Sequence, residues 1–179
     1  MPKWYGGGAL NPDGLVPAHE QWRDQWSRVQ RWARRVRGLK RKAEFSELSP
    51  EDVDTVLAFF HNAYALRDWI RVCRPDVTSK LNDLFATSFE MGALRDLCNG
   101  FKHKVLERPS HDADFNLYRE VDPFQSEIDS LRSEIRYRVA FADGDDIRRY
   151  DLFEYAEECV RHWGRFVNAE CLDSAGGEA

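Results

Sequence analysis

The sequence predicts a mostly α fold, a four-helix-bundle-like domain with a small antiparallel β-hairpin inserted before the last helix. Apolar residues recur every three or four positions over four long segments, as in helices with one buried face. Between residues 109 and 150 the period changes to two, which is typical of strands, and Asp143-Gly144 is a tight-turn dipeptide. With 179 residues, 42% of them hydrophobic and 32% charged, the chain suits a single globular domain.

The first helix is expected from Pro17 to about Lys42, after an irregular arm of residues 1–16 that is rich in Gly, Pro and Asn. Its apolar side includes three tryptophans, Trp22, Trp26 and Trp32. Residues 1–43 hold ten Lys or Arg against three Asp or Glu, a net charge of +7, so the remainder carries −12. We therefore expect a basic helix on an acidic body.

This basic helix has three interpretations. In the first, it binds the phosphates of a nucleic acid. In the second, it neutralises acidic neighbours within the fold or in a partner subunit. In the third, it docks a protein partner, since Trp and Arg together are typical of interface hot spots. The candidate nucleic-acid contacts are Arg31, Arg34, Arg35, Lys40 and Arg41.

The second helix has a strong start signal, a capping Ser49 followed by Pro50 at the first helical position. We expect it to end at about Cys73, before a proline. A short helix is expected over residues 79–87, and a third long helix from about residue 89 to 106.

A small antiparallel sheet should follow. Alternation is clear over Ile135–Phe141, the chain returns over Ile147–Tyr150, and a weaker alternation near residues 115–121 leaves a third strand open. A short polar helix is expected near residues 123–133. Asp151 then resembles the start of a capping box that opens the last helix.

That last helix should run to about Glu170. The domain therefore covers residues 17–172, and residues 173–179 form a frayed, disordered tail.

The most polar stretch inside a helical pattern is residues 95–103, and an earlier stretch mirrors its Asp and His in the opposite order. The later stretch contains Arg95, Asp96, Asn99, Lys102 and His103, and the earlier one contains His61, Arg67 and Asp68. If these two helices pack antiparallel, the two histidines lie level and the two aspartates lie about 10 Å further along. We expect the earlier residues to form a second shell or the opposite wall, on a covered face.

Acid–base chemistry on RNA is one interpretation of the later stretch. His103 is suited to proton transfer near neutral pH, and Arg95 and Lys102 to holding a phosphate. In the other interpretation Asp96, Asn99 and His103 are a hydrogen-bonded structural stripe, with Arg95 paired to Asp68. The protein is an enzyme in the first interpretation and not necessarily one in the second, and the sequence does not decide between them.

The Arg95, Asp96 and His103 run, on the third long helix of a bundle, resembles the HEPN superfamily of bacterial defence and toxin proteins. His103 follows Arg95 by eight residues, where the family spacing is four to six. The resemblance implies RNA as a partner, a metal-independent endoribonuclease site and completion of that site across a homodimer. Many members are not catalytic, which keeps a non-enzymatic interaction or dimerisation module as the alternative.

Other classes of chemistry lack a motif. There is no His-Glu-x-x-His and no Gly-x-Ser-x-Gly, so we expect no metal, no cofactor and no serine nucleophile. Cysteines are widely spaced and are expected to be buried free thiols: Cys73, Cys98, Cys159 and Cys171. No apolar run approaches the ~20 residues of a membrane helix, and the N-terminus lacks an apolar signal core. A cytoplasmic protein without a membrane partner is expected.

Overall fold

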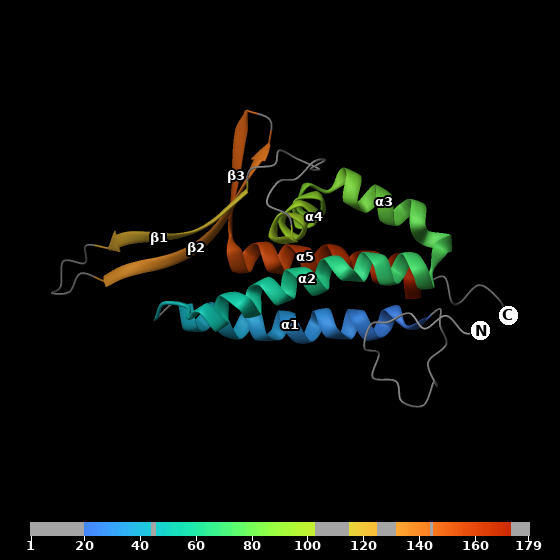
Figure 1. Cartoon of the computed structure of the whole chain (residues 1–179), viewed down its shortest axis with the longest axis horizontal. Coiled ribbons are helices and arrows are strands. Elements are labelled where there is room, and N and C mark those ends of the chain that lie inside the picture. The colour runs from blue at the N-terminus through green and yellow to red at the C-terminus, as the bar shows by residue number, and fades with distance from the viewer. Residues whose placement is uncertain (1–19, 44–45, 103–114, 125–131, 144, 173–179) are drawn as a thin grey trace.

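A computed structural model of the chain describes residues 20–43, 46–102, 115–124, 132–143 and 145–172. The predicted fold class is confirmed: four long helices dominate these residues, and an antiparallel hairpin comes immediately before the last of them (Figure 1). The long helices are α1 (Trp22–Ala43), α2 (Pro50–Cys73), α4 (Phe89–Lys102) and α5 (Leu152–Phe166). The shorter helical segments are η2 (Pro75–Val77), α3 (Thr78–Thr87) and the π-helical turn η3 (Val167–Leu172).

Local capping explains where two of the long helices begin. The Ser49 hydroxyl accepts a hydrogen bond from the Asp52 backbone N–H, and the Asp52 carboxylate accepts one from the Ser49 N–H, a complete capping box. The Asp151 carboxylate accepts from the N–H groups of Phe153 and Glu154 at the start of α5. Both starts agree with the sequence prediction, because capping depends on residues within one helical turn.

The sheet has three antiparallel strands in the order β1-β2-β3, so the third strand left open by the sequence is present. Its strands are β1 (Phe115–Phe124), β2 (Arg132–Asp143) and β3 (Asp146–Asp151). The polar helix expected near residues 123–133 is wrong at both ends, because Pro123 pairs with Ser133 and Phe124 with Arg132 in the ladder. Cross-strand pairing therefore overrides the local pattern there, and residues 125–131 lie outside the described part.

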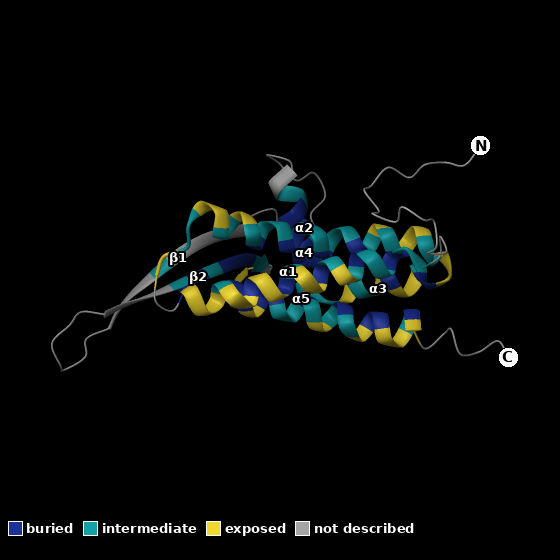
Figure 2. Ribbon diagram, turned by 90° about the horizontal axis from the view of Figure 1, so that it is seen from below, coloured by how far each residue is buried: buried dark blue, intermediate teal, exposed yellow. Residues whose placement is uncertain are grey.

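One core joins the helices to the sheet, and Figure 2 shows the buried positions running along the inner faces of the helices and onto β2. Its largest fully buried members come from every long helix: Trp22, Phe59, Phe60, Met91, Leu94, Tyr155 and Trp163. The sheet is also held by a hydrogen bond, in which the Leu48 backbone N–H donates to the Tyr137 hydroxyl at 2.7 Å. At the opposite end of α2, the Arg74 Nη1 donates to the Cys171 carbonyl at 3.0 Å.

The order of the helices across the bundle decides which predicted residues can meet. α2 and α5 each contact both α1 and α4. Figure 1 accordingly shows α1 on one side of the α2–α5 pair, with α3 and α4 on the other side. The predicted end of the third long helix, the N-terminal arm and the C-terminal tail fall at residues 103–106, 1–16 and 173–179, outside the described residues.

Candidate functional site

Four of the five predicted nucleic-acid contacts lie together on the outer face of α1. We call Arg31, Arg34, Arg35 and Arg41 the arginine stripe. All four are exposed, and their spacings of three, four and seven bring them onto one face over about 15 Å of helix. None has an acidic partner within the described part of the chain. Arg35 also lies over the Trp32 ring, 4.4 Å from its centroid, a cation–π contact.

Three other cations of α1, Arg37, Lys40 and Lys42, pair with acidic residues of neighbouring helices. Arg37 donates from Nε and Nη2 to the two carboxylate oxygens of Glu157 on α5, at 2.6 and 2.7 Å. Lys40 lies 4.0 Å from Glu154, and Lys42 pairs with Asp52. Thus neutralisation within the fold is confirmed for these three cations. Lys40, the fifth predicted contact, faces α5 and is separate from the stripe.

The tryptophans of α1 face inward. Trp22 is 1% exposed, and Trp26 and Trp32 are partly buried and packed against the core. The core therefore accommodates most of their area, which removes the main reason for expecting a protein partner on an indole-rich surface of α1.

On α4, the polar run is only partly exposed. The Arg95 side chain is 30% exposed, whereas that of Asp96 is 3% exposed and lies 3.6 Å from Arg95 Nε. Asn99 is partly buried, on the turn after Asp96. Lys102 ends the helix, but its side chain and all of His103 lie outside the described residues. The structure thus brings Arg95 and Asp96 together and leaves the position of the proposed proton-transfer histidine untested.

Among the described residues, Asp68 of α2, the counterpart of Asp96 in the mirrored segment, does not contact the polar run of α4. The Asp68 side chain is 60% exposed and pairs with Arg71 at 3.4 Å, so the predicted Arg95–Asp68 ion pair and the covered face at Asp68 are both wrong. The reason is its place on the helix, about 200° around from the buried Leu66 and Ile70.

Arg67 and His61 are better covered than Asp68. Arg67 packs on α3, where its Nη2 donates to Asn82 Oδ1 at 3.2 Å and its guanidinium lies 5.2 Å from the Phe85 centroid. His61 is partly buried. Arg67 is therefore engaged in joining α2 to α3, which is a structural contact.

Within the described residues, the arginine stripe does not meet Arg95 or Asp96 in one chain. The arginine stripe faces outward from α1, whereas Arg95 and Asp96 belong to α4 on the far side of the α2–α5 pair (Figure 1). A ligand that contacts both must span the bundle or lie between two copies of the chain.

The structure also contains a polar cluster that sequence reasoning missed. The Glu90 carboxylate accepts hydrogen bonds from the Tyr150 and Ser88 hydroxyls at 3.0 and 3.2 Å, and it lies 3.5 Å from His162 Nε2. The Tyr155 hydroxyl donates to the Glu90 carbonyl at 2.9 Å.

Burial alone would raise the pKa of Glu90. Its backbone contact, the two hydroxyls and His162 together outweigh burial, so the pKa lies below its ordinary value. The cluster ties the start of α4 to β3 and α5. Its one local signal is Ser88, whose hydroxyl accepts a hydrogen bond from the Met91 N–H at the start of α4, and this signal did not enter the sequence prediction.

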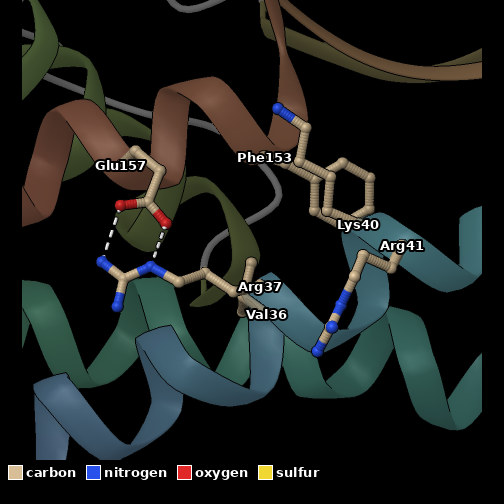
Figure 3. Close-up of a pocket in the computed structure, with 6 residues that line it drawn as sticks. All are labelled: Val36, Arg37, Lys40, Arg41, Phe153 and Glu157. Atoms are coloured by element: carbon tan, nitrogen blue, oxygen red, sulfur yellow. Dashed lines mark hydrogen bonds and ion pairs between the residues drawn. The ribbon is translucent and has the colours of Figure 1, made fainter.

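A groove of about 380 Å³ lies between the C-terminal half of α1 and the start of α5. It is lined by Val36, Arg37, Lys40, Arg41, Phe153 and Glu157. Figure 3 shows the Arg37–Glu157 pair bridging the two helices beside it. Because Arg41 belongs to both, the groove opens at the C-terminal end of the arginine stripe.

The described part of the chain contains no group of three or more His, Cys, Asp or Glu side chains arranged to hold a metal ion. Among its helices none is both long and apolar enough to cross a membrane. Comparison of the chain with protein-family models, with curated proteins and with solved structures gives no match.

Proposed function

We propose that this protein is a cytoplasmic, HEPN-like protein that binds RNA through the arginine stripe on α1. The observation that carries the proposal is that seven of the nine α1 cations fall into two sets. Arg37, Lys40 and Lys42 face acidic partners of the fold, whereas the four stripe arginines face solvent without one in the described residues. A row of guanidinium groups without acidic partners is suited to a phosphate backbone, since each can bind a phosphate through two N–H donors.

The charge of the rest of the molecule limits where a polyanion can bind. Residues 44–179 carry a net charge of −12, against +7 for residues 1–43. Most of the surface would therefore repel RNA, and the contact should be confined to α1.

The binding test is a titration of labelled single-stranded RNA with wild type and with the Arg31→Gln, Arg34→Gln, Arg35→Gln triple variant. A matched control replaces three exposed arginines outside α1, Arg71, Arg161 and Arg165, by Gln. The proposal predicts that the stripe variant loses most of the affinity while the control, with the same net charge, keeps it. Equal loss in both variants would mean that only the total charge matters, and absence of binding by the wild type would refute the proposal.

The second part of the proposal concerns cleavage. We propose that Arg95 contacts a phosphate of the RNA, that the buried Asp96 positions the Arg95 guanidinium, and that Asn99, Lys102 and His103 complete a metal-independent acid–base site. The support is the partial exposure of Arg95 beside a buried carboxylate, together with the resemblance of the run. Because α1 and α4 lie on opposite sides of the bundle, the proposal also includes a homodimer, in which the stripe of one copy serves the run of the other.

Cleavage is tested with RNA in EDTA, comparing wild type with His103→Ala and recording thermal melts of both. The proposal predicts cleavage by the wild type, and a variant that is inactive but melts normally. No cleavage by the wild type would leave RNA binding without catalysis.

The alternative is a structural polar run in a non-enzymatic module, and the burial of Asp96 is the observation that favours it. In that case Asp96→Ala should cost about 1–3 kcal/mol of stability, because it leaves buried partners without a hydrogen-bonding group. A variant that melts within a degree of wild type would count against this alternative.

A further inference from the structure

The groove between α1 and α5 continues the arginine stripe, and the two surfaces meet at Arg41. The groove is chemically different from the stripe. Its floor is apolar, formed by Val36 and Phe153, which are 2% and 5% exposed. Its rim carries Lys40 and Arg41, which are both exposed.

Charge indicates that the groove is not a phosphate site. Arg37 is already bonded to both carboxylate oxygens of Glu157, and Lys40 lies near Glu154. These pairs leave Arg41 as the one rim cation without an acidic partner in the described residues. An apolar floor with paired charges beside it suits an uncharged, flat and partly polar group. Burying the face of that group on the floor is favourable, and its polar edge can hydrogen-bond to the paired charges.

We propose that the groove receives a base of single-stranded RNA whose backbone follows the arginine stripe. The inference rests on the proposed RNA binding and names its substrate class, a strand whose bases are free to turn out of a stack. A duplex keeps its bases paired inside the helix, so it can use the stripe but cannot fill the groove. Bases in single strands commonly dock beside aromatic side chains, with the phosphates held by a neighbouring basic surface.

The ion pair between Arg37 and Glu157 supplies the polar side of such a site. Two hydrogen bonds fix the Arg37 guanidinium against the Glu157 carboxylate, and Figure 3 shows both groups beside the groove. A guanidinium has five N–H donors and a carboxylate accepts more than one hydrogen bond, so the pair can offer both a donor and an acceptor to a base edge.

The experiment compares two strands of equal charge on the wild-type protein, a strand of about 12 uridines and the same ribose-phosphate strand without bases. We expect the uridine strand to bind about tenfold more tightly, because only it can fill the groove. Equal affinity for both strands overturns the inference and leaves RNA binding by the stripe intact. If neither strand binds, the proposed function itself fails, and the inference with it.

Two matched variants locate the effect. Phe153→Leu removes the ring at the groove floor, and Phe166→Leu makes the same change at another buried position of α5, outside the residues that line the groove. We expect Phe153→Leu to lower the preference for uridine over the baseless strand, and Phe166→Leu to keep it. A preference that is unchanged in Phe153→Leu, in a protein that melts like Phe166→Leu, overturns the assignment to this groove.

Discussion

Arg37 and Glu157 join α1 to α5 through two nearly parallel hydrogen bonds, from Nε to Oε1 at 2.6 Å and from Nη2 to Oε2 at 2.7 Å. The hydrogen bonds to Glu157 raise the pKa of Arg37 further above its already high ordinary value. Arg37 is thus one of the α1 cations that pair with acidic residues of the fold. The proposed function rests on the contrast with the stripe arginines, which have no acidic partner in the described residues.

The first prediction concerns the strength of this pair. Its side chains are 51% and 35% exposed, so solvent screens the charges and the coupling should be only about 0.5–1 kcal/mol. A double-mutant cycle with Arg37→Ala and Glu157→Ala, followed by urea unfolding, measures it. The coupling should weaken in high salt. A value of several kcal/mol, or no dependence on salt, would contradict this account of an exposed pair.

A second prediction tests the start of α5. Asp151→Ala removes the acceptor for two backbone N–H groups and should lower the free energy of unfolding by about 1 kcal/mol. Asp151→Asn, which keeps a capping oxygen, should cost less. Alanine at the exposed neighbour Asp145 serves as the control and should have little effect. If the Ala variants at 151 and 145 unfold alike, the cap does not contribute.

The third prediction is a pH dependence that originates at Glu90. Its pKa is below the ordinary 4.5 in the folded protein, so ionised Glu90 adds stability above the unfolded pKa, and this contribution is lost as the pH falls through the folded pKa. Glu90→Gln should therefore be less stable than wild type at pH 7, and the difference should shrink between about pH 5 and pH 3. Urea unfolding across that range measures the difference, and a difference that stays constant with pH would show that ionisation at Glu90 does not matter.

The fourth prediction concerns the thiols, all of which are free. Cys98, Cys159 and Cys171 are buried and Cys73 is partly exposed. Burial raises the pKa of Cys171 to about 11, and it raises the pKa of Cys73 as well. Iodoacetamide at pH 8 should therefore modify the native protein slowly and at Cys73 first, since only a thiolate reacts and access is limiting. Peptide mapping after a timed reaction identifies the site, and earlier labelling of Cys98 would contradict the packing of α4.

Features that depend on a single turn of the chain were predictable from the sequence. The capping residues Ser49 and Asp151 placed the starts of α2 and α5 correctly, and the return of the chain after β2 was predicted, since Asp143 pairs with Asp146. The inward face of α2 also followed from its helical period.

Features that depend on which elements meet were not predictable. Asp68 and Asp96 looked alike in their mirrored segments, yet one is exposed and the other is buried, because burial depends on the neighbouring helix and not on the local pattern. The Glu90 cluster joins residues up to 74 positions apart, Ser88 and His162, and no local signal marks such a contact. The pairing of Arg37, Lys40 and Lys42 likewise depends on the positions of α5 and α2.

The most direct test of RNA binding by the arginine stripe is the salt dependence of the dissociation constant for single-stranded RNA. Each phosphate contact on a single strand contributes about 0.7 to the slope of log K against log salt concentration. The Arg31→Gln, Arg34→Gln, Arg35→Gln variant should therefore lose about 2 from the slope of the wild type, while the Arg71, Arg161 and Arg165 control keeps it. Identical slopes for wild type and the stripe variant would show that these arginines do not contact the phosphates, and would contradict the proposed function.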